Sequence, residues 1–193
     1  MENQVKNNQG LKKGFPAMTD QAPKRRRGSR SSSEYKKSLS EKQALKRLYG
    51  LSEKQFKKYV RDALERMQKV ENVSDELIKK LEKRLDNVVF RLAFAKSRMA
   101  ARQLVSHAYF LVNDKSVNIP SFQVKMGDLI SIKENKKKKG VFNNLSEILK
   151  KYNTPSWLEI EKNKFEGKII GSPTLSEVNP PVEISLIFEF YSR

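Results

Sequence analysis

Apolar residues at regular spacing begin only after residue 38 of this 193-residue chain. The first 38 residues contain mainly Asn, Gln, Gly, Ser and Pro around the basic run at residues 23–33. Such a segment cannot bury enough apolar surface to offset the entropy lost on ordering it. We therefore predict a basic, disordered N-terminal arm over residues 1–38, and a folded core in the remainder of the chain.

The formal net charge of +18 is spread unevenly along the chain. Residues 1–50 carry a net +9, residues 51–115 a net +6 and residues 116–193 a net +3. A charge of this size indicates a polyanionic partner. For the basic run of the arm taken alone, a solvated linker or a nuclear-localisation-like tract is the alternative interpretation.

Composition excludes several classes of function. The chain has no cysteine and one histidine, His107, so disulfides, cysteine zinc sites and two-histidine metal sites are excluded. The longest uncharged stretch, residues 103–113, falls short of the roughly 18 apolar residues of a membrane span. The first ten residues lack the apolar core of a signal peptide. We expect a protein of a reducing cytosol, with an organelle matrix as the less favoured location.

No pattern of an enzyme active site is found. Glycine-rich nucleotide motifs and HExxH are absent. Asp86 lies nearest to an apolar run, but a bond to a neighbouring arginine or to the backbone explains it equally well. His107 has no nucleophile at a motif spacing. We therefore predict no enzymatic activity, no cofactor and no metal.

Helical spacing starts at Ser40 and stops at Gly50. Ser52 and Gln55 then form a capping box that begins a second helix with one apolar stripe from Phe56 to Met67. Ser74 begins a further helical region whose apolar face runs to Leu92.

Ser97 caps another predicted helix, in which Arg98 and Arg102 lie four residues apart beside the apolar face. Arg84 and Arg91 are placed in the same way on the preceding helical region. The guanidinium group of arginine can donate two parallel hydrogen bonds to phosphate oxygens, so this pattern of arginines predicts a phosphate-binding surface. Basic residues that merely solvate a helix are the alternative.

Strand-like spacing follows His107. Residues 109–112 and 117–119, separated by a turn at residues 113–115, predict a hairpin, and residues 129–132 predict another strand. A short helix is expected at residues 145–151, an extended segment at residues 155–160 and a final strand at residues 183–191.

Several uncommon words of this sequence resemble, in order, those of small-subunit ribosomal protein four. They are RLDNVVFRL at residues 84–92, ARQLVSH at 101–107, VNIPS at 117–121, PSWLE at 155–159 and the terminal FYSR. The resemblance covers about four fifths of the chain, from Glu41 onward. Family members often carry a four-cysteine zinc site near the N-terminus, so this chain is similar to a zinc-free, bacterial-type member.

The resemblance implies an α+β fold, in which a helical domain carries an inserted module of two helices and a small sheet that binds RNA. We place the arm at residues 1–38, the first helical part at 39–83, the module at 84–140 and the returning C-terminal helix and strands at 141–193. It also implies a structural protein of the small ribosomal subunit that binds the 5′ domain of the ribosomal RNA, nucleates assembly and influences decoding accuracy. The implied partners are this RNA, messenger RNA at the entry tunnel, and small-subunit ribosomal proteins three and five, with no membrane partner.

The predicted RNA-binding residues come from three parts of the chain. In the arm they are Lys24, Arg25, Arg26, Arg27 and Arg30, and the four arginines are also candidates for the messenger entry path. On the first helices they are Lys42, Lys46, Arg47, Tyr49 and Gln55. On the module they are Arg84, Arg91, Lys96, Arg98, Arg102, Gln103, Ser106 and His107. Lysines and arginines are expected on phosphates, and the other side chains on sugars or bases.

Two alternatives from other classes remain. An enzyme with the same RNA-binding module, such as a pseudouridine synthase, would need more chain after the module and a catalytic aspartate. A nucleoid-type polycation would bind by charge alone, and would not need capped helices with arginines beside their buried faces.

Overall fold

The computed structural model describes residues 30–192, with side-chain surroundings from residue 33 onward. The helices are α1 (Arg30–Leu48), α2 (Glu53–Leu64), α3 (Val73–Glu82), α4 (Leu85–Arg91), α5 (Arg98–Ser106), α6 (Glu134–Lys137), α7 (Leu145–Lys151), α8 (Leu175–Val178) and α9 (Ile184–Ser192). Two 3₁₀ turns, η1 (Met67–Lys69) and η2 (Gly140–Phe142), join them. The strands are β1 (Phe110–Val112), β2 (Lys115–Ser116), β3 (Leu129–Ile132), β4 (Leu158–Glu161) and β5 (Glu166–Ile169).

The strands form one antiparallel sheet in the order β2-β1-β3-β5-β4. Because β4 and β5 follow residue 140, the sheet joins strands from both predicted ranges, 84–140 and 141–193. The predicted α+β fold class is confirmed, and the division into four ranges stays a prediction.

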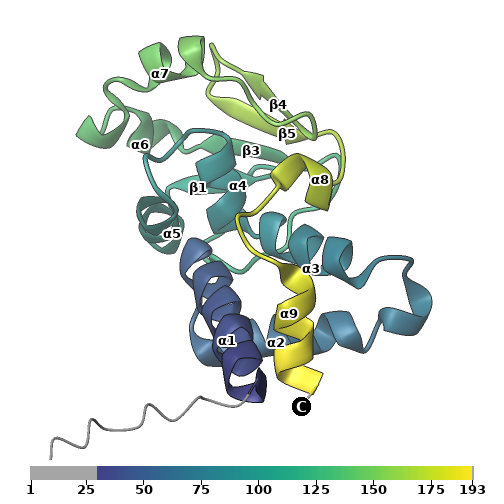
Figure 1. Cartoon of the computed structure of the whole chain (residues 1–193). Helices are drawn as coiled ribbons and strands as arrows, with labels where there is room; N and C mark the ends of the chain where they lie inside the picture. Colours follow the sequence, from purple (N-terminus) through teal and green to yellow (C-terminus); the bar gives the residue numbers. More distant parts are fainter. Residues whose placement is uncertain (1–29, 193) are drawn as a thin grey trace, which may run out of the picture.

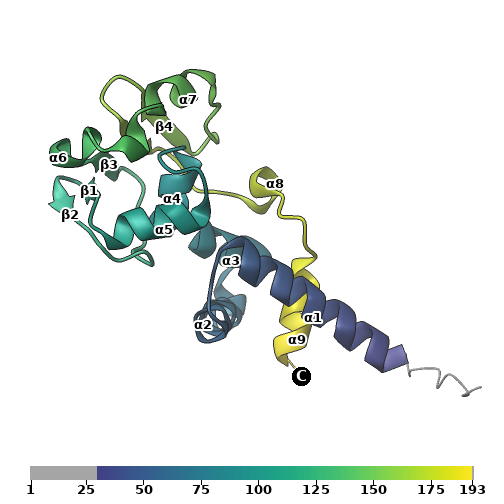
Figure 2. The ribbon, with the colours of Figure 1, turned by 90° about the vertical axis from the view of Figure 1, so that its left-hand side faces the viewer.

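Two separate apolar clusters divide the described residues into two lobes. The helical lobe packs α1, α2, α3 and α9 around a cluster that includes Leu45, Phe56 and Ile187. The sheet lobe packs α4, α5 and α7 against the sheet around a cluster that includes Val88 and Ile130. Figures 1 and 2 show the two lobes at opposite ends of the molecule, with α4 and α5 next to the helical lobe.

Local signals at the helix ends are confirmed. Ser52 and Gln55 form the reciprocal capping box of α2, and Ser97 caps α5 by accepting from the backbone of Ala100. Gly50 ends α1 with φ +61°, a left-handed conformation that glycine adopts without strain. These caps fix the residues at which α2 and α5 begin. They therefore determine which side chains lie near the end of α1.

The hairpin turn also forms, with a shorter second strand than predicted. Asn113 and Asp114 have φ values of 49° and 62°, as a two-residue hairpin turn requires. β2 covers Lys115–Ser116 instead of residues 117–119.

The predicted disordered arm is too long, because α1 already begins at Arg30. The described part of this extra helix packs on α9: the Tyr35 and Phe190 rings lie 5.6 Å apart, and Lys37 Nζ lies 3.0 Å from Glu183 Oε2. The helix is stabilised by a partner about 150 residues away in sequence, so its own spacing does not reveal it.

The predicted final strand is wrong, because residues Ile184–Ser192 form helix α9. Ile184 and Ile187, three residues apart, are its buried residues, which is the spacing of a helix face. The sequence pattern of residues 183–191 is compatible with a strand and with a helix. The helix is stabilised by its packing on α1.

The helical region predicted from Ser74 to Leu92 is two helices. Asn72, instead of Ser74, caps α3. Arg84 is extended, with ψ 137°, and pairs with Gln123, while the backbone of Leu85 donates to the carbonyl of Phe122. These bonds to the loop before β3 break the helix at Arg84 and start α4 in a new direction.

Candidate nucleic-acid interface

The predicted RNA-binding residues fall into two groups once the fold is known. One group is buried or half-buried, with partners within the protein. The other group is exposed at the junction of α1 and α5. The residues from Lys24 to Arg27, and the side chain of Arg30, lie outside the described residues.

Arg84 belongs to the first group, because only 1% of its side chain is exposed. Its Nε and Nη2 donate to the two oxygens of Asp86 at 3.0 and 2.6 Å, and its Nη1 donates to the Tyr59 hydroxyl at 2.8 Å. Burial lowers the pKa of Arg84, but the bonds to Asp86 raise it above its usual value. Arg84 therefore stays charged as half of an internal pair, and its guanidinium is committed to protein oxygens.

Glu82 is the centre of a second buried cluster and was not predicted as a site residue. Its fully buried carboxylate accepts from Tyr49 Oη at 2.6 Å, from Asn87 Nδ2 at 2.7 Å, and from Arg91 Nε and Nη2 at 2.9 and 2.8 Å. Burial would raise the pKa of Glu82, and the bonds and charge of Arg91, with those of Tyr49 and Asn87, lower it below its usual value. Tyr49 and Arg91, both predicted on RNA, are bound to this carboxylate.

Arg98 is half-buried and has both roles. Its Nε donates to Asn87 Oδ1 at 2.8 Å, and its guanidinium carbon lies 4.6 Å from the ring centre of Phe90 and 5.0 Å from that of Tyr49. Desolvation lowers its pKa. Among the described residues, its two terminal nitrogens donate no hydrogen bond, and Nη2 lies 3.8 Å from Glu82 Oε1, so Arg98 is a candidate phosphate donor with one side already fixed.

Lys42 and Lys46 pair with the same acid. Their Nζ atoms lie 2.8 and 2.9 Å from the two oxygens of Glu53, which also accepts from the Tyr191 hydroxyl at 2.9 Å. The bond from Lys42 is the largest cause that lowers the pKa of Glu53 to about 2. This cluster ties α1, α2 and α9 together inside the helical lobe.

Two of the remaining predicted residues, Arg47 and Lys96, are exposed around one groove. The groove, about 300 Å³, lies between the end of α1 and the start of α5 and is lined by Arg47, Lys96, Ser97, Arg98 and Met99, with Leu48, Gly50 and Phe90. Arg47 and Lys96 are exposed and have no acidic partner among the described residues.

Further along α5, the exposed residues are Gln103, Ser106 and His107. Arg102 is half-buried and donates from Nη1 to the carbonyl of Gly50 at 3.1 Å, which joins α5 to the end of α1. Gln55 is used in the capping box of α2. The groove and the exposed side of α5 thus offer cations followed by neutral polar groups, which suits a phosphate backbone with its sugars.

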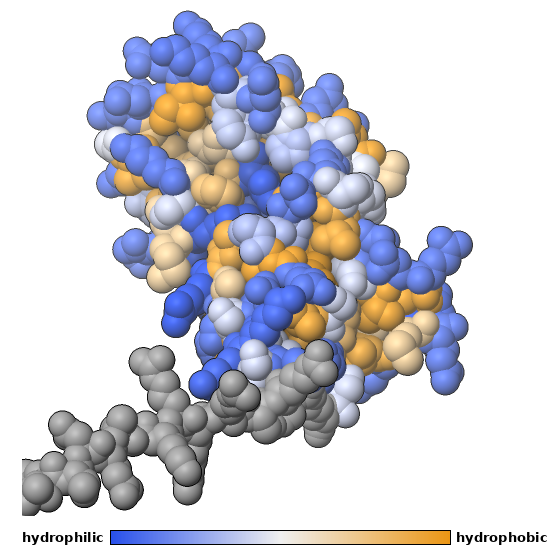
Figure 3. Space-filling view, viewed as in Figure 1, coloured by the Kyte–Doolittle hydropathy of each residue, from blue (hydrophilic) through white to orange (hydrophobic). Residues whose placement is uncertain are grey.

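Two other basic surfaces were not predicted from the sequence, although one of them includes the predicted residues Gln55 and Arg84. A hollow beside α2 and α3 is lined by Gln55, Lys58, Tyr59, Asp62, Arg66, Lys80, Arg84, Ser121 and Gln123. A lysine run at residues 136–139 ends α6, where Figure 3 shows hydrophilic side chains gathered around α6 and α7. The run is visible in the sequence, whereas the hollow collects residues from three distant segments.

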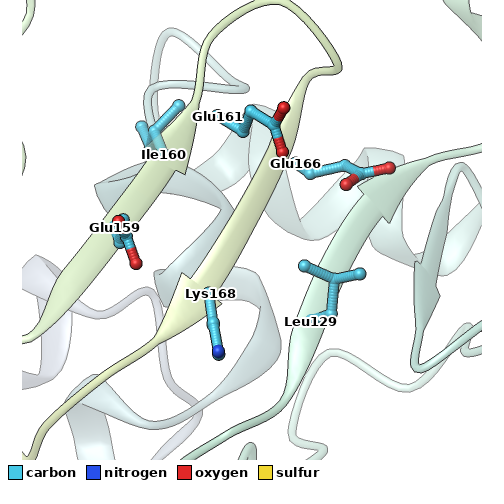
Figure 4. A pocket seen from close by; sticks show the side chains of 6 residues that line it. All are labelled: Leu129, Glu159, Ile160, Glu161, Glu166 and Lys168. Carbon is cyan, nitrogen blue, oxygen red and sulfur yellow. The ribbon is translucent and has the colours of Figure 1, made fainter.

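The outer side of β4 and β5 has the opposite charge. A hollow there is lined by Glu159, Glu161, Glu166 and Lys168, with Leu129 and Ile160 (Figure 4). Glu161 and Glu166 are direct partners in the pairing of β4 with β5. Three carboxylates against one ammonium repel phosphate, so this side of the sheet is not a candidate for RNA contact.

Neither a metal cluster nor a membrane span is found in the part of the chain from residue 30 to residue 192. No three His, Asp or Glu side chains gather there as ligands. No helix in that part is long and apolar enough to cross a membrane.

Comparison with known families supports the resemblance seen in the motifs. Residues 3–82 match the model of the ribosomal protein S4/S9 N-terminal domain, and residues 83–130 match that of the S4 domain. The first match begins within the arm, which the motif comparison did not cover.

Curated relatives agree over most of the chain. Small ribosomal subunit protein uS4 of Thermoanaerobacter sp. (strain X514) is 43% identical over 190 residues, which cover 94% of this chain and 90% of that protein. The proteins of the same name from Halothermothrix orenii and Caldicellulosiruptor saccharolyticus are both 46% identical, over 160 and 162 residues. Each of these two comparisons covers 83% of this chain and 76% of the relative. The chain therefore belongs to the uS4 family of small ribosomal subunit proteins and is a structural, non-enzymatic, RNA-binding protein of the cytoplasmic ribosome.

Proposed function

We propose that this protein binds the 5′ domain of small-subunit ribosomal RNA directly and nucleates assembly of the subunit. The observation that carries the proposal is the groove between α1 and α5, where Arg47, Lys96 and Arg98 converge. The exposed residues Gln103, Ser106 and His107 further along α5 add neutral polar groups to these cations. RNA is recognised largely by its shape, its 2′-hydroxyls and its unpaired bases. Cations can bind phosphates placed by that shape, and neutral polar side chains can hydrogen-bond to 2′-hydroxyls and bases.

The buried and half-buried arginines support the proposal indirectly. Arg84, Arg91 and Arg102 bond across the boundary between the lobes. They give the groove a rigid base instead of contacting phosphate themselves. The number of phosphates held is therefore smaller than the full set of predicted cations implies, and the exposed cations carry the binding.

A salt titration tests direct binding. Filter binding of a transcribed 5′-domain RNA should give an affinity that falls steeply with salt, by about 10³ to 10⁵ between 50 and 200 mM if 6 to 10 phosphates are held. A slope near zero would contradict the proposal. Equal affinity for duplex DNA of the same length would instead favour the polycation alternative.

A double variant tests the groove itself. Arg47→Ala with Lys96→Ala should reduce the slope of log affinity against log salt by about 2, because each lost phosphate contact removes about one unit. The matched control is Lys69→Ala with Lys168→Ala, which removes the same charge from exposed positions outside the groove. Equal effects of the two double variants would show that position does not matter.

The arm has a separate proposed role at the messenger entry tunnel, beside small-subunit ribosomal proteins three and five, through which the protein influences decoding accuracy. The support is the run of Arg25, Arg26, Arg27 and Arg30, a cluster of cations suited to single-stranded RNA. Reversing these four charges should slow translation of structured messages while assembly stays nearly normal. An assembly defect without a translation defect would mean that the arm binds ribosomal RNA only.

A further inference from the structure

Arg98 is the only cation of the groove whose side chain is held by a chain of buried hydrogen bonds among the described residues. The chain runs from Tyr49 to Glu82, from Glu82 to Asn87 and from Asn87 to Arg98. Asn87 is 2% exposed and Glu82 is fully buried. Neither side chain lines the groove.

In this series of hydrogen bonds, the chemical groups themselves decide which atom donates and which accepts. The carboxylate and the backbone carbonyl of Glu82 only accept hydrogen bonds, at 2.7 and 3.1 Å, so Asn87 turns its Nδ2 to Glu82 and its Oδ1 away from it. That orientation leaves Oδ1 as an acceptor 2.8 Å from Arg98 Nε. Glu82 thereby sets the amide orientation on which the Arg98 side chain depends.

The remaining contacts of Arg98 restrict its motion further. Its guanidinium carbon lies over the rings of Phe90 and Tyr49, and Nη2 forms an ion pair with Glu82 Oε1 at 3.8 Å, beyond hydrogen-bond distance. Nε is therefore used inside the protein, and the terminal nitrogens are left for a ligand. An arginine fixed in this way loses less side-chain entropy on binding phosphate than a free lysine does.

We propose that Glu82 is a positioning residue for RNA binding: through Asn87, it holds Arg98 in the orientation that presents the guanidinium to an RNA phosphate in the groove. This inference rests on the proposed function and adds a residue that the motif analysis did not select. Glu82 touches no RNA itself.

The test is a double-mutant cycle with the full-length chain and the transcribed 5′-domain RNA. Glu82→Gln removes the charge and leaves one side-chain oxygen to accept the bonds from Tyr49, Asn87 and Arg91, so Asn87 is held mainly by the backbone carbonyl of residue 82 and positions Arg98 less firmly. We expect Glu82→Gln and Arg98→Ala each to weaken binding about tenfold, the effect of losing a hydrogen bond to a charged group. In the Arg98→Ala background, Glu82→Gln should change the affinity less than twofold.

A milder variant covers the case in which Glu82→Gln does not fold. Tyr49→Phe removes the hydroxyl bond to Glu82 and keeps the ring beside Arg98. It should weaken binding about threefold, again only when Arg98 is present. The matched control is Tyr152→Phe, which removes a hydroxyl bond to the Arg91 carbonyl and has no hydrogen bond to Glu82 or Asn87 among the described residues. The control should bind with the affinity of the parent protein.

The possible results separate the two claims. Independent, multiplicative losses from Glu82→Gln and Arg98→Ala would overturn the positioning role, because a merely structural Glu82 weakens binding whether or not Arg98 is present. Unchanged affinity in folded Glu82→Gln and Tyr49→Phe would overturn it as well. A parent protein with no preference for the 5′-domain RNA over duplex DNA would overturn the proposed function, and the inference with it.

Discussion

Arg84 and Arg47 carry the same guanidinium group, but their surroundings differ, so we expect different effects when each is removed. Arg84 is buried and faces the carboxylate of Asp86, and Arg47 is exposed without an acidic partner in the described chain. Removing one member of a buried ion pair leaves the other charged and unsolvated. Removing an exposed cation usually changes stability by less than about 0.5 kcal/mol.

Arg84→Ala should therefore destabilise the protein by about 3 to 5 kcal/mol, because it strands Asp86 and frees the Tyr59 hydroxyl. Arg47→Ala should leave stability unchanged within about 0.5 kcal/mol and reduce the salt slope of RNA binding by about 1. Urea unfolding gives the first quantity and filter binding the second. A reduced salt slope in Arg84→Ala, with a stability loss in Arg47→Ala, would mean that Arg84 contacts RNA in the complex.

Glu53 predicts a specific acid sensitivity. Its pKa is lowered to about 2, first by the bond from Lys42, from an ordinary value near 4.5. A group with a lowered native pKa contributes stability above its unfolded pKa, and this contribution is lost as the pH falls towards the native pKa.

The stability difference between the parent and Glu53→Gln should therefore be largest above pH 5 and shrink between pH 4.5 and pH 2. Because the side chain is 48% exposed, we expect only about 0.5 to 1 kcal/mol at pH 7. Urea midpoints across this pH range measure it. A difference that is constant with pH would assign the effect to lost packing instead.

At the scale of elements, α9 illustrates how tertiary contacts decide between two structures. Its residues alternate well enough for a strand, yet Ile184 and Ile187 are the ones buried. They enter the same cluster as Leu45 of α1 and Phe56 of α2. A strand would instead bury Ile184, Leu186 and Phe188, on alternate positions.

Ile187→Ala should cost about 2 to 5 kcal/mol, as deletion of a fully buried aliphatic side chain does. Ser185→Ala, at an exposed position of the same helix, should stay within about 0.5 kcal/mol. The measurement is thermal or urea unfolding of the two variants. Tolerance of Ile187→Ala would contradict the packing of α9 on α1.

Elements with local signals were predictable, and elements defined by distant partners were not. The capping box at Ser52, the cap at Ser97 and the turn at Asn113 act over three or four residues, so the sequence alone reveals them. The start of α1 and the break at Arg84 depend on α9 and on the loop before β3, which no local pattern contains. The same limit applied to the site: charge and spacing identified the arginines, and only the fold separates those bound to Glu82 and Asp86 from those facing the groove.

At the scale of the whole molecule, charged groups fill the boundary between two apolar clusters that share no residue. The crossing bonds include those from Arg84 to Tyr59, from Arg102 to the Gly50 carbonyl, and from Arg91 and Asn87 to Glu82. Directional bonds of this kind fix the angle between the two lobes, whereas a small apolar contact would let one lobe shift relative to the other. If both lobes contact the RNA, as proposed, holding them at one angle raises the effective concentration of the second contact.

We therefore predict a single, narrow distance between the lobes, measurable by double electron–electron resonance. The chain has no cysteine, so spin labels at Lys57→Cys on α2 and Ser146→Cys on α7, both exposed, are the only labelled sites. Tyr59→Phe with Arg102→Ala removes two of these crossing bonds and should broaden the distribution. Ser97→Ala, which removes a cap within the sheet lobe, should leave its width unchanged.

Adding the 5′-domain RNA should narrow the broadened distance distribution again, because an RNA bound to both lobes holds them at one angle. Equal widths in all variants would mean that the chain connections alone fix the lobes, with no contribution from the charged boundary.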